Sequence, residues 1–499
     1  MGIRSVFGRP FSLYIRQQNK KWTLEPFGFQ DNILKSIVSR AADTVFGKDH
    51  DFHSIKNYDD FRLKVPIRDY ETLKPYINRA VDGENDILWP GQPAYFCKTS
   101  GTTSGTKYIP LTKESIPNHF NSARNALFLY LLETGNYRIL DGKLIFLSGS
   151  PVLEEKNGIK IGRLSGIVNH HIPAWLRSNQ MPSYETNSID DWEQKVDQIV
   201  AETIDKDMRL ISGIPPWVQM YFDRLKAKSG KKIKDLFPNF SLFMYGGVNF
   251  EPYRVRLFES IGTEIDSIET YPASEGFIAY QDTQTDEGLL LLLDSGIFFE
   301  FIPADEYFLD NPTRLNIEEV ETGINYVLII NSNAGLWGYS IGDTIKFVSK
   351  NPYRIVVTGR IIHFISAFGE HVITEEVEKA MKITMENHHE VELIEFTVAP
   401  NVTPEEGLPH HEWYIEFANP PDNWNDFIKT LDQTLCDSNS YYNDLITGNI
   451  LSQLKIVEVR RNTFINYMKS IGKLGGQNKV PRLSNDRKIA EKLQTYRKT

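Results

Sequence analysis

The chain has 499 residues, more than the ~250–300 residues at which a single hydrophobic core stops growing, so we expect two or more domains. Its hydrophobic fraction of 41% and charged fraction of 24% are those of a globular protein. The net charge is −10 and there is no long basic block, which disfavours nucleic-acid binding. No apolar run approaches the ~20 residues that span a bilayer. We therefore expect a cytoplasmic protein without nucleic-acid or membrane partners. We also expect a monomer.

Helical and strand-like patterns alternate along the first 360 residues. Apolar periodicity predicts helices over 33–46, 114–132, 189–204 and 217–228, and a further one over 375–385. Apolar runs predict strands over 144–147, 208–212, 242–245, 263–269, 326–330 and 354–357. Ser188 is the expected N-cap of the third helix, with Asp191 in its first turn. The alternation predicts an α/β fold with a largely parallel sheet, and residues 289–342 predict an attached antiparallel layer.

A change of pattern follows Thr358-Gly359-Arg360. Beyond it the order becomes strand, helix, strand, strand, helix, ending in a basic tail from Lys479. We expect a large domain over residues 1–359 and a small, mobile α+β domain over residues 360–499, with the hinge at Gly359-Arg360.

The segment from Lys98 to Lys107 combines glycines, hydroxyl side chains and flanking lysines. Glycine permits close approach of the backbone to a ligand, and exposed amides with Ser/Thr hydroxyls bind phosphate oxygens. Strand-like residues lead into the segment and apolar residues follow it, which argues against a flexible linker. We predict a phosphate-binding loop, although the spacing is not that of the Gly-x4-Gly-Lys-Ser/Thr loop.

A second polar segment, residues 270–276, follows the strand over 265–268. Ligands in open α/β folds bind at the carboxyl edge of the sheet. There Tyr271 could face a nucleobase, Ser274 could contact a phosphate, and Glu275 could bind Mg²⁺. The alternative is an ordinary strand-to-helix turn capped by Ser274.

Two weaker signals flank this segment in the sequence. Gly246-Gly247 ends a strand and could leave bare backbone for a planar ligand. Asp343, in the turn that begins at Tyr339, could accept from vicinal ribose hydroxyls. Each is also compatible with a plain turn.

In this order, the four elements resemble the adenylate-forming superfamily of acyl ligases. The chain is most similar to the Gretchen-Hagen-type (auxin-responsive) acyl-acid–amido synthetases, in a bacterial version, over residues 96–482. It departs from the superfamily at Ser340, where an arginine is usual. The resemblance implies cofactor-binding roles for Thr99, Ser100, Gly101, Thr102, Thr103, Ser104, Thr106, Lys107, Gly246, Gly247, Tyr271, Ser274, Asp343 and Arg360.

The resemblance also implies a catalytic lysine in the small domain. Lys479, in a Lys-x-Pro-Arg pattern, is the preferred candidate and Lys488 the alternative. Glu275 takes a catalytic role as the Mg²⁺ ligand. Arg124 is a candidate contact for the acyl acid, although an arginine on a long helix usually faces solvent.

The activity implied is an ATP- and Mg²⁺-dependent ligation. A carboxylic acid is adenylated, and its acyl group is transferred to an amine, usually that of an amino acid. Three alternatives remain open: an acyl-CoA ligase, an acyl-protein synthetase with a reactive Cys97, and a nucleotide-binding module without ligase activity.

Overall fold

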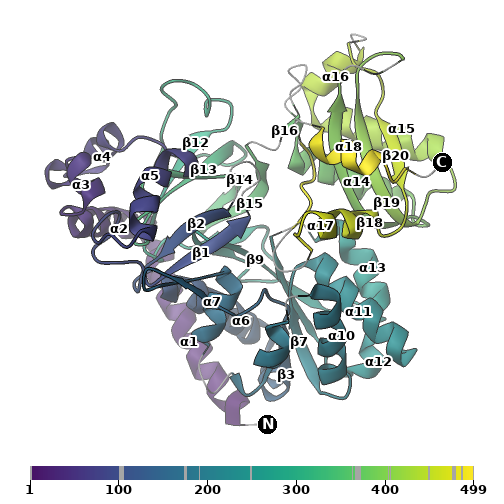
Figure 1. The fold of residues 1–499 in the computed structure, drawn as a ribbon, viewed down its shortest axis with the longest axis horizontal. Helices are drawn as coiled ribbons and strands as arrows, with labels where there is room; N and C mark the ends of the chain where they lie inside the picture. The colour runs from purple at the N-terminus through teal and green to yellow at the C-terminus, as the bar shows by residue number, and fades with distance from the viewer. Residues whose placement is uncertain are drawn as a thin grey trace.

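The computed structural model describes residues 3–100, 106–172, 177–189, 191–247, 250–361, 364–365, 372–402, 404, 406–447, 450–474, 479–484 and 487–497. We call the chain up to Arg360 the large part and the chain from Phe364 the C-terminal part (Figure 1). Within the described residues, no helix has the length and apolar character needed to cross a membrane.

The large part is built on a sheet in which 11 described strands form one continuous ladder. In spatial order these are β12 (Ile297–Pro303), β13 (Asn325–Ser332), β14 (Tyr339–Lys350), β15 (Tyr353–Arg360), β11 (Leu289–Leu291), β10 (Gly276–Tyr280), β9 (Asp266–Ala273), β8 (Leu242–Gly246), β7 (Met208–Ser212), β3 (Lys143–Phe146) and β6 (Gln180–Met181). The strands from β9 to β6 pair in parallel, and those from β12 to β9 pair antiparallel.

A smaller sheet and a set of helices surround this ladder. The small sheet has the order β2 (Thr106–Leu111), β1 (Tyr95–Ser100), β5 (Ile159–Gly162) and β4 (Glu154–Lys156). The helices are α1 (Ile3–Leu24), α2 (Pro26–Ala41), α3 (Val45–Asp49), η1 (Phe52–Ser54), α4 (Tyr58–Lys64), α5 (Tyr70–Val81), α6 (Ile116–Thr134), η2 (Tyr137–Asp141), α7 (Leu164–His170), α9 (Tyr184–Asn187), α10 (Trp192–Thr203), α11 (Pro215–Ser229), α12 (Ile233–Leu236) and α13 (Glu251–Ile261).

The parallel strands are apolar on both faces because each face is covered by helices. Successive side chains of a strand point to opposite sides. On β8, Leu242 and Met244 belong to the core beneath α6, and Phe243 and Tyr245 belong to the core beneath α10, α11 and α13. This arrangement leaves the carboxyl ends of β7, β8 and β9 as the open edge of the parallel sheet.

The predicted α/β class with a smaller C-terminal region is confirmed, with three local differences. The expected antiparallel layer is a continuation of the parallel sheet through β10, β11 and β15. Strand β9 extends through Ala273, past the predicted end at residue 269. The N-cap of α10 is Asp191, whose carboxylate accepts from the Gln194 backbone amide, whereas Ser188 ends α9.

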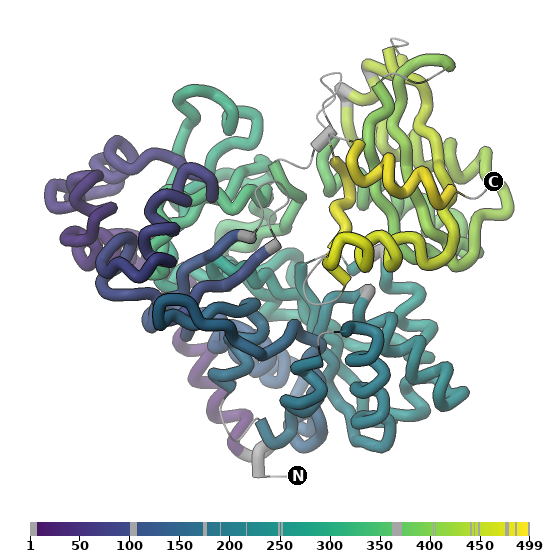
Figure 2. The backbone as a smooth tube through the Cα atoms, in the orientation of Figure 1, coloured from purple at the N-terminus to yellow at the C-terminus, as the bar shows by residue number. Residues whose placement is uncertain are grey.

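The C-terminal part has cores of its own and lies next to α13 (Figure 2). Its elements are β16 (Phe364–Ile365), β17 (Val372–Ile373), α14 (Thr374–Asn387), β18 (Glu392–Asn401), β19 (His410–Asn419), α15 (Trp424–Ser438), α16 (Ser440–Thr447), β20 (Lys455–Val459), α17 (Thr463–Ser470) and α18 (Lys488–Gln494). Strand β20 and helices α16, α17 and α18 were not predicted. The domain boundary at 359/360 stays a prediction.

A buried ion pair attaches the N-terminal helices to the sheet. Glu300 on β12 is fully buried and accepts hydrogen bonds from Arg314 Nε at 2.9 Å and Nη2 at 2.8 Å. The Tyr58 hydroxyl of α4 donates to the same carboxylate at 3.0 Å. Arg314 also donates to the backbone carbonyls of Arg62 and Val65. The guanidinium therefore joins α4 and the following turn to the sheet.

Replacing Arg314 by Met is expected to destabilise the large part by about 3–5 kcal/mol, because it leaves the Glu300 carboxylate buried without its cation. Chemical unfolding followed by tryptophan fluorescence measures the loss. Arg224→Met is the control, since Arg224 pairs with Asp197 at an exposed site and such pairs contribute roughly 0–1 kcal/mol. Equal effects of the two substitutions would contradict this account.

Candidate active site at the junction of the two parts

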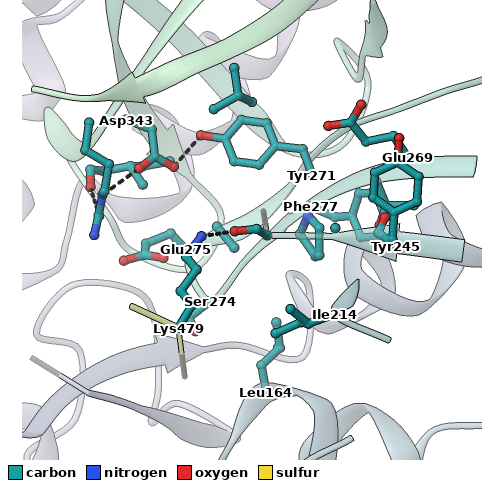
Figure 3. Close-up of a pocket in the computed structure, with 18 of the residues that line it drawn as sticks. Leu164, Ile214, Tyr245, Glu269, Tyr271, Ser274, Glu275, Phe277, Asp343 and Lys479 are labelled. Carbon is teal, nitrogen blue, oxygen red and sulfur yellow. Dashed lines mark hydrogen bonds and ion pairs between the residues drawn. The ribbon is translucent and has the colours of Figure 1, made fainter. Parts of the chain in front are cut away.

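A cavity of about 2030 Å³ opens at the carboxyl ends of β7, β8 and β9 and extends to the C-terminal part (Figure 3). Ligand pockets commonly measure ~300–1,000 Å³, so this cavity can hold more than one small molecule. The predicted residues that line it are Thr99, Lys107, Arg124, Gly246, Gly247, Tyr271, Ser274, Glu275, Asp343, Arg360, Lys479 and Lys488. The fold thus brings together side chains up to 389 positions apart in the sequence (99 to 488).

The predicted phosphate-binding loop connects the antiparallel strands β1 and β2. Thr99 and Lys107 are opposite each other in this pair, and both reach the cavity. Gly101, Thr102, Thr103 and Ser104 lie outside the described residues, and Ser100 and Thr106 are described only as strand ends. The structure therefore positions the base of the loop at the cavity.

Asp343 on β14 is held between an aromatic hydroxyl and a guanidinium. The Tyr271 hydroxyl donates to Asp343 Oδ2 at 2.6 Å, and Arg360 Nε donates to Oδ1 at 2.8 Å. Arg360 also donates to the Ile341 carbonyl at 2.8 Å. The charge of Asp343 raises the pKa of the Arg360 guanidinium. These contacts fix the carboxylate in one orientation, as Figure 3 shows, at the end of the β14–β15 ladder.

Glu275 lies in the turn between β9 and β10 and points into the cavity (Figure 3). Burial raises the pKa of its carboxyl, and the positive charges of Arg360 and Lys107 act in the opposite direction. The Tyr339 hydroxyl donates to Oε1 at 3.4 Å, which is long for an O–H···O hydrogen bond. A carboxylate in this setting is stabilised by an additional cation.

Ser274 belongs to the same turn, which leads into the antiparallel strand β10. The expected alternative, a strand-to-helix turn capped by Ser274, is therefore wrong. The Ser274 hydroxyl accepts a hydrogen bond from Cys97 Sγ at 3.2 Å. This contact connects the β9–β10 turn to β1.

The two positions of the glycine pair at the end of β8 favour glycine for different structural reasons. A Cβ on Gly246 would lie 2.4 Å from the Thr270 carbonyl oxygen of β9, so the close pairing of these strands requires glycine there. Gly247 has φ +80°, a conformation that favours glycine. Its carbonyl accepts a hydrogen bond from the Lys479 ammonium.

Lys479 comes from the C-terminal part and reaches the edge of the large sheet (Figure 3). The residue is exposed, and its ammonium contacts the Gly247 carbonyl at the end of β8. Desolvation lowers the pKa of Lys479, Asp343 opposes this shift and Arg360 adds to it. Lys488, at the start of α18, lines the same cavity. Of the two candidates, Lys479 is the one whose ammonium contacts the glycine pair.

Arg124 on α6 is half-buried at the cavity. Its guanidinium lies 5.0 Å from the centre of the Phe11 ring of α1 and donates to Asn125 Oδ1 at 3.0 Å. Arg124 therefore packs against α1 at the cavity wall and is only partly exposed, and burial lowers its pKa. Its contact with an acyl acid stays a proposal.

Sequence reasoning gave no role to three residues at or beside this site, namely Tyr339, Tyr253 and Arg482. Tyr339 begins the predicted ribose segment and donates to Glu275. Tyr253 of α13 contacts Arg482, the last residue of the Lys-x-Pro-Arg pattern. Arg482 could have been singled out because it lies three positions from Lys479, whereas nothing in the sequence around Tyr253 marks it.

The fold is similar to the folds of two solved ligases. It superposes on the AtGH3.15 acyl acid amido synthetase in complex with 2,4-DB with a TM-score of 0.80 and 17% identity, covering 98% of this chain and 96% of that one. A 2-hydroxyisobutyryl-CoA ligase in its postadenylation state matches with a TM-score of 0.60 and 12% identity, over 93% and 91% of the two chains. The fold is therefore that of the adenylate-forming ligases.

Three family models match in order: the GH3 family N-terminal domain over residues 16–196, the central domain over 290–360 and the C-terminal domain over 375–488. The chain belongs to the GH3 family, as the resemblance predicted. Its relatives include a jasmonoyl–L-amino acid synthetase, JAR4, of Nicotiana attenuata, with 22% identity over 91% of this chain and 90% of that protein. The indole-3-acetic acid-amido synthetase GH3.3 of Arabidopsis thaliana is 21% identical over 93% and 90%.

Neither cysteine is expected to react with a thiol reagent in the native protein. Cys97 and Cys436 are both buried, and burial raises the pKa of each thiol to about 12, which leaves little thiolate at pH 8. Labelling with 5,5′-dithiobis(2-nitrobenzoate) should be slow in buffer and reach two thiols in guanidinium chloride. Rapid labelling of native Cys97 would contradict its burial and revive the acyl-protein synthetase alternative.

Proposed function

We propose that the protein is an ATP-dependent ligase that adenylates a carboxylic acid and transfers the acyl group to the amino group of an amino acid. The observation that carries the proposal is the convergence of Glu275, Asp343, Arg360 and Lys479 on one cavity. The family membership supports it, since its relatives are named as synthetases that join an acid to an amino acid.

The side chains that line the site are of the kinds that bind the ribose and the phosphates of adenosine triphosphate. Asp343 has its orientation fixed by Tyr271 and Arg360, so its carboxylate can accept from ribose hydroxyls without reorganising. Thr99 and Lys107 lie at the base of the predicted phosphate loop. We propose that the adenosine binds beside β8 and β9, with Tyr271 next to the base and the phosphates directed toward the β1–β2 hairpin.

Glu275 fits a role as the protein ligand of Mg²⁺. Magnesium is usually held by one or two carboxylates together with substrate phosphates, and Glu275 supplies one carboxylate in a partly neutralised setting. When bound there, Mg²⁺ would offset the negative charge of the phosphates. To bind Mg²⁺, Glu275 must be ionised although burial raises the pKa of its carboxyl.

In the first half-reaction an oxygen of the substrate carboxylate attacks the α-phosphorus. The bond from that phosphorus to the bridging oxygen breaks, and pyrophosphate leaves with the electron pair. Because two anions must meet, positioning and positive charge carry most of the catalysis. We assign this charge to the Lys479 ammonium, which exchanges its contact with the Gly247 carbonyl for the incoming carboxylate and the α-phosphate.

In the second half-reaction a neutral amine attacks the acyl carbon of the adenylate. The carbon–oxygen bond to AMP breaks, AMP leaves with the electron pair, and the amine loses a proton. The amine needs access to the face that Lys479 occupies during adenylation. We propose that the C-terminal part, taken as the domain over 360–499, moves about Gly359-Arg360 to provide it, a type of motion that often limits turnover.

The acyl acid would occupy the apolar end of the cavity near α6. Phe120, Leu127 and Phe128 of α6 line it together with Phe146 and Val168. This lining favours an acid with an aromatic or extended apolar group. Arg124, on the same helix, would contact a polar substituent or the carboxylate of that acid.

Two of the alternatives are weakened on specific grounds. The buried Cys97 disfavours an acyl-protein synthetase, and the synthetase names of the relatives disfavour a silent binding module. A CoA ligase shares the first half-reaction, and one structural neighbour is a 2-hydroxyisobutyryl-CoA ligase. The acceptor therefore decides between the two remaining functions.

A panel of aromatic and aliphatic acids, including indole-3-acetate and jasmonate, should contain at least one that drives ATP–pyrophosphate exchange. With that acid, AMP formation should increase when a mixture of the twenty amino acids is added. Mass spectrometry should then detect an N-acyl amino acid. Stimulation by coenzyme A and not by amino acids would instead favour the CoA ligase.

Lys479→Ala is expected to lower the exchange rate by about 10²–10³-fold, the range found when one charge-stabilising donor is removed. Lys488→Ala is the matched control from the same cavity and should retain most of the activity. A larger loss for Lys488→Ala than for Lys479→Ala would show that the alternative lysine is the catalytic one.

The exchange rate should fall on the alkaline side at a pH below 10.4, the ordinary pKa of lysine. The rate falls on this side because desolvation lowers the pKa of Lys479. The ammonium loses its proton, and its charge, as the pH rises through that lowered value. In Lys479→Arg the residual activity should persist to higher pH, since a guanidinium stays charged. The same alkaline limb in both proteins would assign it to another group.

A further inference from the structure

Arg482 is buried where the two parts meet, with 7% of its surface exposed. Within the C-terminal part its Nε donates to Glu378 at 3.2 Å, and its Nη1 donates to Glu395 and to the Phe396 carbonyl. Two carboxylates of its own part therefore neutralise the guanidinium. Desolvation lowers the pKa of Arg482, but Glu395 and Glu378 outweigh it and the pKa is raised. The guanidinium stays charged, as arginine does in proteins.

The chain around Arg482 is fastened to β18 by backbone hydrogen bonds. The Val398 amide donates to the Arg482 carbonyl at 2.8 Å, and the Ser484 amide donates to the Val398 carbonyl at 3.0 Å. Thr397 Oγ1 donates to the Pro481 carbonyl at 2.7 Å. Lys479 precedes this fastened segment by only a few residues, so the position of its backbone follows that of β18.

Tyr253 of α13 is the contact of Arg482 in the large part. It is 5% exposed, and the Arg482 guanidinium carbon lies 5.4 Å from the centre of its ring. The hydroxyl accepts from Arg482 Nη2 and donates to Glu395 Oε1 at 3.1 Å. One hydroxyl of the large part thus bridges a guanidinium and a carboxylate of the C-terminal part.

This contact has the properties of a reversible latch. When the parts separate, Arg482 keeps Glu378 and Glu395, and Tyr253 is neutral, so no buried charge loses its counter-ion. Breaking this contact therefore costs hydrogen bonds to charged groups and the ring contact, and leaves no unpaired charge. Other described contacts across the junction are more exposed, such as the ion pair from Lys469 to Glu193 at 2.5 Å.

We propose that Tyr253 is a positioning residue that latches the C-terminal part in the orientation where Lys479 faces Gly247. The latch favours adenylation and must open for transfer of the acyl group to the amine. The predicted effect on catalysis rests on the proposed function. The predicted effect on how firmly the two parts are held together does not, and it can be measured without any substrate.

The test compares Tyr253→Phe, which removes the bridging hydroxyl and keeps the ring, with Glu193→Gln, which weakens the exposed ion pair. Hydrogen–deuterium exchange of the ligand-free protein, followed by peptide mass spectrometry, should show faster uptake in α13 and residues 479–484 for Tyr253→Phe only. Uptake in both segments equal to that of the unsubstituted protein would overturn the latch, whether or not the protein is a ligase.

The catalytic readout separates the two half-reactions. Using the acid that gives the fastest exchange, Tyr253→Phe should lower ATP–pyrophosphate exchange roughly tenfold, the effect of one hydrogen bond to a charged group. Aminolysis of the chemically prepared acyl-adenylate should stay unchanged or become faster. An equal fall in both half-reactions would reduce Tyr253 to a structural residue. No exchange with any acid in the unsubstituted protein would refute the proposed function and leave the deuterium result to decide the latch.

Discussion

The hydrogen bond from the Lys479 ammonium to the Gly247 carbonyl is the interaction on which the arrangement of the site depends. It brings a cation of the C-terminal part to the edge of the parallel sheet in the large part. Gly247 can present its carbonyl in this way because its φ of +80° suits glycine. Without this contact the Lys479 ammonium would not be held beside the edge of β8, next to Asp343, Arg360 and Glu275.

The two carboxylates of the cavity, Asp343 and Glu275, have different environments. Asp343 is held by Tyr271 and Arg360, whereas burial raises the pKa of the Glu275 carboxyl. The two acids therefore differ in environment, as expected where one recognises a ligand and the other meets a cation. The family membership gives this arrangement a context, and the roles of the individual residues are our proposals.

The sequence could predict the motifs but not how far the strands around them extend. Strands that are buried on both faces have nearly continuous apolar sequences, which are easy to recognise. For this reason the sequence predicts the strands over 208–212 and 242–245. The sequence predicts Tyr271 in a polar segment after the strand over 265–268, yet pairing with β10 continues that strand through Ala273. The sequence predicts Ser188 as the N-cap of α10, whereas the structure has Asp191 there. Both side chains can accept a hydrogen bond from a backbone amide, so the sequence alone does not distinguish them. The contact between Tyr253 and Arg482 depends on the approach of distant segments, which no local pattern encodes.

The most direct test of the account follows an oxygen atom of the carboxylic acid. If that oxygen attacks the α-phosphorus and the amine later breaks the carbon–oxygen bond, AMP must retain it. With an acid labelled with ¹⁸O in both carboxylate positions, mass spectrometry should find one ¹⁸O in AMP for each amide formed. Unlabelled AMP, or label in inorganic phosphate with ADP as the co-product, would contradict the adenylation mechanism.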